Sequence, residues 1–396
     1  MIDLRAARDH PQELRAALAR KGAAERFDAL LEADGRWRSL LPRVEELRGR
    51  QKRRGAPTPE ELAELAVVKE ELRVAEEELA RAEAERDALL ELVPNPPDPS
   101  APDGASEEDA LELRRVGEPR AGGPEHTEVG RFEMERAARI SGSRFGYIVG
   151  DTALVALALY RLALESACSH GHTPMLPPVL VREQAMYGTG FFPTDRSNIY
   201  SLEADGLYLT GTSEVALAGF HMDEILEQLP LRYCAFSTCF RRESGAAGKD
   251  TRGMFRVHQF NKVELFSFCE PGRSGEEHER LLAIEEELVQ SLGIPYRVVN
   301  VAAGDLGDPA AKKYDIEAWF PSQGRYREIT STSNTTDFQA RRLGIRYRPE
   351  GGRPEPPHTL NGTAVTDRWL LALLENFGGE VPPVLTALGA PASVGR

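Results

Sequence analysis

The chain has 396 residues, of which 41% are hydrophobic and 28% are charged, and its formal net charge is −14 at pH 7. This length gives room for two domains with a substantial core, and the composition is that of a soluble protein. The negative total argues against a protein that coats DNA non-specifically, although a local cationic patch would still allow a nucleic-acid partner.

No apolar run approaches the roughly 20 residues of a membrane span, so no membrane partner is expected. Residues 1–22 contain no apolar signal-peptide core, which predicts a cytoplasmic protein. The four cysteines form no CxxC pair, so the sequence predicts neither a disulfide framework nor a zinc site. They are Cys168, Cys234, Cys239 and Cys269.

Residues 1–92 are expected to be almost entirely helical. Apolar or small residues recur at heptad spacing within residues 30–47 and again within 65–89, where Arg86 interrupts the pattern. Turn-forming residues lie between the two runs, at Gly55, Pro57 and Pro59. The sequence therefore predicts an antiparallel helical hairpin. Pro42 falls inside the first helix, where we expect it to kink or break that helix.

The predicted tip of this hairpin is strongly basic. Its cations are Arg48, Arg50, Lys52, Arg53 and Arg54. Taken alone, a dimerisation coiled coil with a solvated basic end explains this pattern better than RNA binding does.

A proline-rich, polar segment at residues 93–109 is typical of a linker. We therefore predict a helical domain over residues 1–105. Helix-like and β-like runs alternate beyond about residue 110, which predicts an α+β domain over residues 106–396.

Residues 240–264 combine several arginines, isolated glutamates and a glycine-rich middle. We predict two strands joined by a turn at 244–253, with side chains alternating between two faces. The polar face then carries Arg241, Glu243, Arg256, His258, Phe260, Lys262 and Glu264. The other face carries Phe236, Phe240, Phe255, Val257, Val263 and Leu265 and is expected to join the core.

The polar face of this hairpin suits a nucleoside triphosphate. Arg241 and Arg256 can bind phosphate oxygens, and Phe260 can stack on a purine. Glu264 can accept a hydrogen bond from a small polar substrate. On the hairpin alone, a solvated sheet face with salt bridges explains the alternation equally well, and both interpretations stay open. His258 and Lys262 carry less weight in either case.

The segment FRRESGAAGKDTRGMFRVHQFNKVEL resembles motif 2 of a class II aminoacyl-tRNA synthetase, specifically of the seryl-tRNA synthetases. Other segments resemble that family in the same chain order. They are motif 1 at about 152–181, the TSE serine-binding segment at 209–221, motif 2 at about 232–268, the stretch before motif 3 at 304–342 and motif 3 at about 358–377. The helical hairpin is similar to the family's tRNA-binding arm, so the resemblance covers nearly the whole chain.

The resemblance implies an α+β fold with an antiparallel sheet flanked by helices, an N-terminal coiled-coil arm and a homodimer. It implies a serine--tRNA ligase that makes seryl-adenylate and pyrophosphate from L-serine and ATP, then transfers serine to the 3′ end of tRNA-Ser. Mg²⁺ is expected with ATP, as a hard cation on carboxylate and phosphate oxygens. No zinc is expected, because the Cys and Glu ligands of the zinc-dependent branch are missing. DNA is not expected as a partner.

The resemblance also assigns roles to individual residues. The catalytic residues are Arg241, Arg256 and Arg368. The serine-binding residues are Thr212, Glu214, Arg241, Glu264, Asn361 and Thr363. The ATP-binding residues are Arg241, Glu243, Arg256, Val257, Phe260, Glu328, Ser331 and Arg368, of which Glu328 and Ser331 also hold Mg²⁺. The tRNA-binding residues are Arg48, Arg50, Lys52, Arg53, Arg54, Lys249 and Arg252.

The residues around Arg368 support its role independently. Thr366 and Asp367 are typical helix-start residues, so Arg368 is expected near a helix N-terminus, a favourable place to bind an anion. The run from Asn361 to Arg368 is about one residue shorter than in many relatives. Two alternatives therefore stay open: a paralogue that supplies seryl-adenylate or seryl-tRNA to antibiotic biosynthesis or resistance, and a non-catalytic RNA-binding dimer.

Overall fold

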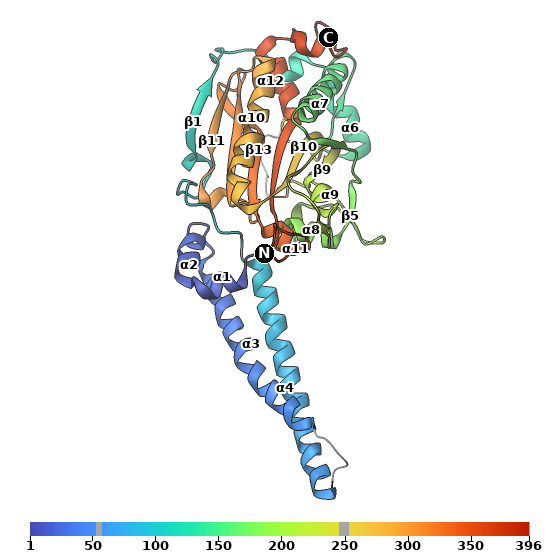
Figure 1. Ribbon diagram of the computed structural model, residues 1–396. Helices are drawn as coiled ribbons and strands as arrows, with labels where there is room; N and C mark the ends of the chain where they lie inside the picture. Colours follow the sequence, from blue (N-terminus) through green and yellow to red (C-terminus); the bar gives the residue numbers. More distant parts are fainter. Residues whose placement is uncertain (53–57, 245–252, 396) are drawn as a thin grey trace. The chain divides into compact units, whose positions relative to one another are not determined.

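The computed structural model describes residues 1–52, 58–244 and 253–395 (Figure 1). The chain divides into two compact units, Met1–Pro96 and Pro97–Arg396, here called the N-terminal unit and the C-terminal unit. The sequence placed the boundary at residue 105, later in the same proline-rich segment. Residues 97–105 lie with the C-terminal unit because their backbone bonds to it, as in Asp98 N to Ala311 O at 2.8 Å.

The N-terminal unit is helical, with two long helices packed along each other (Figure 1). Its helices are α1 (Leu4–Asp9), α2 (Pro11–Ala19), α3 (Ala24–Gln51) and α4 (Pro59–Leu92). The predicted helical hairpin is therefore confirmed. Its seam buries the heptad residues Val44, Leu47, Val68, Leu72 and Ala75. Thr58 begins α4 with a capping box, in which its side chain and that of Glu61 each accept the other's backbone N–H.

Two irregular positions in this hairpin behave differently from expectation. Helix α3 continues through Pro42, so the expected break does not occur. Pro42 is exposed, so water can reach the carbonyl that lacks an N–H partner. Arg86 is buried in the seam with its guanidinium 4.1 Å from the ring centroid of Trp37. A cation–π pair thus fills the interruption in the heptad pattern.

The C-terminal unit is built on one large sheet with the strand order β1-β11-β12-β13-β15-β10-β9-β4. Every neighbouring pair is antiparallel except β4 with β9, so the predicted antiparallel sheet is confirmed. The strands are β1 (Leu111–Val116), β4 (Thr173–Met175), β9 (Leu231–Phe240), β10 (Gln259–Cys269), β11 (Tyr296–Asn300), β12 (Lys312–Phe320), β13 (Arg325–Thr336) and β15 (His358–Thr366).

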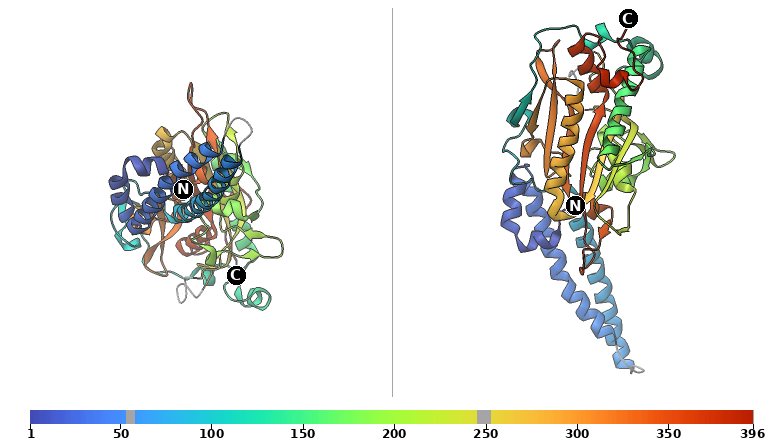
Figure 2. Two further views of the ribbon diagram at one scale, coloured as in Figure 1. Left: turned by 90° about the horizontal axis from the view of Figure 1, so that it is seen from below. Right: turned by 45° about the horizontal axis from the view of Figure 1, so that its top comes forward.

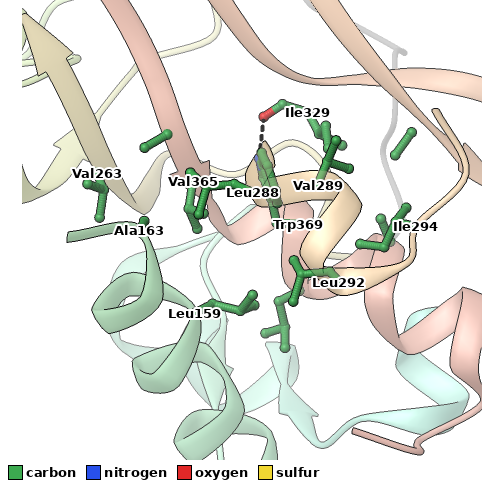
Figure 3. Close-up of a cluster of buried hydrophobic side chains, with 14 of the residues drawn as sticks. Leu159, Ala163, Val263, Leu288, Val289, Leu292, Ile294, Ile329, Val365 and Trp369 are labelled. Carbon is green, nitrogen blue, oxygen red and sulfur yellow. Dashed lines mark hydrogen bonds between the residues drawn. The ribbon is translucent and has the colours of Figure 1, made fainter. Parts of the chain in front are cut away.

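Helices cover both faces of this sheet (Figure 2). One face packs against α7 (Asp151–Ser169), α10 (Ser274–Leu292) and α12 (Asp367–Phe377). Figure 3 shows Trp369 of α12 among Leu159 and Leu292, with its indole N–H donating to the Ile329 carbonyl at 3.2 Å. The other face packs in part against α9 (Glu214–Gly219) and α11 (Phe338–Arg342), which contact Phe266 and Phe268 of β10.

Shorter elements complete the C-terminal unit. The helices are α5 (His126–Val129), α6 (Met134–Ser141), α8 (Glu183–Thr189) and α13 (Pro383–Thr386), with 3₁₀ turns at Glu107–Asp109, Arg196–Asn198, Pro271–Arg273 and Ala303–Asp305. Three small sheets contain β2 (Phe132–Glu133) with β3 (Tyr147–Ile148), β5 (Leu180–Arg182) with β6 (Ser201–Leu202) and β7 (Leu207–Leu209), and β8 (Ile225–Leu226) with β14 (Arg346–Tyr347).

Helix α7 corrects one expectation from the sequence. By length and composition alone it is apolar enough to cross a membrane, whereas no run of that kind was expected. One side of α7 packs into the core through Val155, Leu159 and Ala163. Its outer side exposes Leu154 and Leu157, which are 49% and 59% accessible. Apolar residues on both sides of one helix explain its composition.

The predicted motif 2 strands are shorter than expected. They pair as β9 and β10, but β9 ends at Phe240 and β10 begins at Gln259. Backbone donors beyond these ends bond elsewhere, as in Arg242 N to Asn198 O and His258 N to Arg144 O. Within β10 the predicted alternation is confirmed, because Val263 and Leu265 lie in the core. The predicted turn at 244–253 falls largely outside the described residues.

Candidate active site

Nearly all the predicted substrate-binding residues meet in one pocket, on the sheet face opposite α7, α10 and α12. The pocket is lined by Thr212, Glu214, Arg241, Glu243, Arg256, Val257, Phe260, Glu328, Ser331, Asn361, Thr363 and Arg368. Glu264 is buried beside it and bonds to Thr212. Residues far apart in sequence, from Thr212 before α9 to Arg368 in α12, therefore share one site.

The predicted tRNA-binding residues lie elsewhere or are not described. Arg48, Arg50 and Lys52 lie at the end of α3 in the N-terminal unit. Arg48 and Arg50 form ion pairs with Glu76 and Glu71 of α4 and stay more than half exposed. The remaining four, Arg53, Arg54, Lys249 and Arg252, lie outside the described residues.

Two β-bulges help to place the polar residues on this face. On β13 the pairing with β12 shifts between Ile316 and Glu317, so that Glu317 faces Glu328 while Ile316 faces Thr330. On β15 the pairing with β10 shifts between Val263 and Glu264, so that Glu264 lies across from Thr363. Bulges of this kind commonly lie beside active sites, where they redirect side chains.

The inner part of the pocket is a network of carboxylates and hydroxyls. Thr212 Oγ1 donates to Glu264 Oε2 at 3.0 Å, and Lys262 forms an ion pair with the same carboxylate. Glu264 is only 1% exposed. Lys262 carried little weight as a predicted site residue, although its spacing of two from Glu264 on one strand places both on the same face.

Glu214 forms the second carboxylate of the inner pocket. Its Oε1 accepts hydrogen bonds from Gln339 Nε2 at 2.7 Å and Asn361 Nδ2 at 2.8 Å. Burial, and then the nearby Glu264 charge, raise the pKa of Glu214 to about 7. A cationic ligand beside Glu214 would offset both effects, so this position suits an ammonium group.

The outer part of the pocket is cationic. Arg241 Nε donates to the Gly211 carbonyl at 3.2 Å, and its guanidinium lies 5.2 Å from the Phe260 ring centroid. Arg256 Nη1 donates to Glu243 Oε2 at 2.6 Å. Glu243, predicted as an ATP-binding residue, thus holds Arg256 in this structure. The two guanidiniums face a space that an anion can enter.

Arg368 lies in the first turn of α12, as the sequence predicted. Thr366 is the N-cap, and its hydroxyl accepts the Arg368 N–H at 3.3 Å. The Arg368 guanidinium lies 4.6 Å from the Phe255 ring centroid, and that of Arg327 lies 3.7 Å from it. Phe255 was expected to serve the core alone. It also lies against the pocket residue Arg368 and against Arg327, which the alternation pattern could not indicate because residue 255 is not in a strand.

Glu328 lies among three cations, of which Lys313 was not among the predicted site residues. Burial alone would raise its pKa, but the charges of Lys313, Arg368 and Arg241 outweigh burial and lower that pKa to about 2. Lys313 also pairs with Asp315 at 2.9 Å. The sequence could have indicated this ion pair, because Lys313 and Asp315 are two residues apart and so lie on the same face of a strand.

The residues present fit a Mg²⁺ ion that arrives with a nucleotide. Glu328 offers an ionised carboxylate whose side chain is 46% accessible in the open pocket. Within residues 1–52, 58–244 and 253–395, no group of three or more His, Cys, Asp or Glu side chains is placed to hold a metal ion. A single carboxylate combined with phosphate oxygens is the usual Mg²⁺ arrangement.

Two family models match the chain. The model for the class II tRNA synthetase core domain (G, H, P, S and T) matches residues 200–377, and the seryl-tRNA synthetase N-terminal domain matches residues 1–97. A serine--tRNA ligase of Thermobifida fusca is 48% identical over 96% of this chain and 94% of its own length. One from Nocardia farcinica is 48% identical over 95% and 94%.

Solved structures give the same picture. The crystal structure of seryl-tRNA synthetase from Pyrococcus horikoshii complexed with ATP is similar at a TM-score of 0.92 and 37% identity. The match covers 100% of this chain and 99% of that one. Both units of the chain, including the helical hairpin, therefore have counterparts in that structure.

Proposed function

Because this chain belongs to the seryl-tRNA synthetase family, we propose that it activates L-serine with ATP and transfers the seryl group to tRNA-Ser. The observation that carries this proposal is the pocket in which Arg241 and Arg368 lie beside Glu214 and Thr363. Such a pocket provides cations for a triphosphate and carboxylates for an amino acid.

The inner pocket is the proposed serine site. The carboxylate of Glu214 receives the ammonium group, while Glu264 and Thr363 bind the side-chain hydroxyl. Alanine lacks that hydroxyl and would leave Glu264 and its partners without a hydrogen bond, so it should be rejected strongly. Threonine keeps the hydroxyl and adds a methyl group, which only the shape of the pocket can exclude.

The outer pocket is the proposed ATP site. Phe260 stacks on adenine, Val257 lines the same part of the pocket, and Arg256 and Arg368 bind the outer phosphates. Arg241 contacts both the α-phosphate and the serine carboxylate and so aligns the two reacting groups. When bound with ATP, Mg²⁺ held by Glu328 and Ser331 would neutralise charge on the phosphate oxygens.

The reaction then needs no covalent intermediate on the protein. A serine carboxylate oxygen attacks the α-phosphorus, and the bond to the pyrophosphate oxygen breaks. Arg241 stabilises the charge that develops there. In the second step a ribose hydroxyl at the 3′ end of tRNA attacks the seryl carbonyl carbon, and AMP leaves.

The remaining parts of the proposal concern partners. The basic end of the helical hairpin suits contact with the phosphate backbone of tRNA, which requires no base code. The exposed apolar face of α7 suits a homodimer, because burying Leu154 and Leu157 against a second copy removes them from water. We place this enzyme in the cytoplasm and propose no DNA or membrane partner.

Serine-dependent exchange between ATP and pyrophosphate tests the proposal first. We expect exchange with serine, weak exchange with threonine and none in Arg241→Ala. Charging of tRNA-Ser in the same preparation separates a tRNA ligase from a paralogue that stops at the adenylate. If the folded wild-type protein shows neither pyrophosphate exchange nor tRNA charging, the proposed enzymatic activity is refuted. The alternative of a non-catalytic RNA-binding dimer then remains.

A further inference from the structure

A histidine from a distant part of the chain contacts the segment that leads into β10. His126 of α5 is 5% exposed, and Glu375 of α12 is fully buried. His126 Nδ1 lies 2.9 Å from Glu375 Oε1. The other carboxylate oxygen, Oε2, accepts from the Ser322 hydroxyl at 2.6 Å and from the Ser322 backbone N–H at 3.3 Å. The carboxylate of Glu375 thus has partners on both oxygens.

The second ring nitrogen of His126 faces the backbone of Met254. Met254 N lies 3.2 Å from His126 Nε2. A backbone N–H can only donate, so Nε2 must be the acceptor. The ring hydrogen therefore sits on Nδ1 and is donated to Glu375. The hydrogen-bond network assigns one neutral tautomer of His126, the form with hydrogen on Nδ1.

The approach of the chain to His126 requires glycine at position 253. Gly253 has a φ of +69°, and a Cβ built there would lie 2.7 Å from His126 Nε2. A side chain would collide with the ring and would also strain the backbone. The contact between the ring and this segment is therefore specific to the sequence Gly253–Met254.

The segment that His126 holds belongs to the proposed ATP site. Met254 and Phe255 line the pocket. The Phe255 ring lies under the guanidinium of Arg368 and packs edge-on against Phe320, with the ring centroids 5.4 Å apart. Arg256 follows directly in the chain.

We propose that His126, kept by Glu375 in the tautomer with hydrogen on Nδ1, is a positioning residue for ATP that fixes the backbone carrying Phe255 and Arg256. The inference rests on the proposed function for its ligand. The hydrogen-bond geometry on which it stands can be tested without any activity.

Glu375→Gln is the decisive variant because it keeps the shape of the side chain. The Ser322 N–H still needs an acceptor, so the amide oxygen should stay toward Ser322 and the NH₂ should face His126. Nδ1 would then have to accept, the ring hydrogen would move to Nε2, and Nε2–H would oppose the Met254 N–H. ¹⁵N-histidine NMR of the full-length protein should show this change of tautomer.

The Glu375→Gln variant should change KM for ATP but not KM for serine. In pyrophosphate exchange we expect Glu375→Gln to raise KM for ATP about tenfold, the effect of losing roughly one hydrogen bond. KM for serine should stay within twofold. His172→Gln is the matched control, because His172 is also buried but bonds to the Ala167 carbonyl. Its two KM values should stay those of the wild type.

Either of two results would overturn the inference. One is an unchanged tautomer together with an unchanged KM for ATP. The other is a parallel rise in both KM values with a large loss of thermal stability, which would mean a structural role alone. If Glu375→Gln does not fold, His126→Gln replaces it, with the same division between the two KM values expected. A wild-type protein without exchange would refute the proposed function, while NMR would still decide the tautomer.

Discussion

At the scale of single residues, we expect selection of serine to depend most on Glu264. Its carboxylate is buried and is shared between Thr212 and Lys262. Glu264→Gln should lower kcat/KM for serine by about 100-fold, because it weakens the bond to the hydroxyl and leaves Lys262 buried without a carboxylate. Pyrophosphate exchange over a range of serine concentrations measures this. KM for ATP serves as the internal control, and equal losses for both substrates would contradict the assignment.

Glu285 of α10 gives a prediction on pH and stability. It is fully buried, and its Oε1 lies 2.7 Å from where a Cβ at Gly362 would be. Burial, followed by the charges of Glu264 and Asp315, raises its pKa well above the usual value. As pH rises above about 4.5, the unfolded chain therefore loses this proton while the folded chain keeps it, and stability falls until the folded pKa is reached.

Glu285→Gln removes that titration. The variant should unfold at a temperature roughly 2–4 °C above that of the wild type at pH 8, with a smaller difference at pH 5. Thermal unfolding followed by circular dichroism at the two pH values measures this. The matched control is Glu276→Gln, an exposed position on the same helix, whose pH profile should follow that of the wild type. A difference that does not change with pH would argue against a protonated Glu285.

At the scale of elements, the helical hairpin offers a separate test of tRNA binding. Replacing both Arg48 and Arg50 by Glu should lower kcat/KM for tRNA charging by about tenfold or more, because each phosphate contact becomes a repulsion. Pyrophosphate exchange should stay unchanged, since neither residue belongs to the pocket. Arg15→Glu, which alters an exposed arginine paired with Asp28, is the control. Unchanged charging would point away from this end of the hairpin.

The elements also show what the sequence could and could not predict. Heptad spacing and the turn residues were sufficient for α3 and α4, because the signal for such helices is local. Both β9 and β10 were predicted to extend too far toward the turn that joins them, because Asn198 and Arg144, which accept hydrogen bonds from the backbone there, lie far away in sequence. The contact of Arg86 with Trp37 was missed for the same reason. The pocket residues outside 240–264 came from the family resemblance, whereas those within it were also indicated by strand periodicity.

At the scale of the whole molecule, the outer side of α7 is the proposed homodimer interface. Changing both Leu154 and Leu157 to Glu should convert a dimer into a monomer, because the two charges would be buried in the proposed interface. Sedimentation velocity measures this directly. Glu276→Lys, which changes an exposed charge on α10 instead, is the control. A wild-type protein that sediments as a monomer would contradict the proposed interface.

The bulges in β13 and β15 have a consequence for how this site can change. In a regular strand, side chains on one face share the parity of their residue numbers. Here Glu328 and Ser331 line the same pocket, as do Thr363 and Thr366, although each pair mixes even and odd numbers. The extra residue in each strand resets the parity within the site. The number of residues between the members of each pair is therefore constrained more than the type of those residues. A substitution at Ala364 leaves the alternation of faces intact. Deletion of Ala364 would turn the pocket residues on one side of the bulge in β15 toward the core.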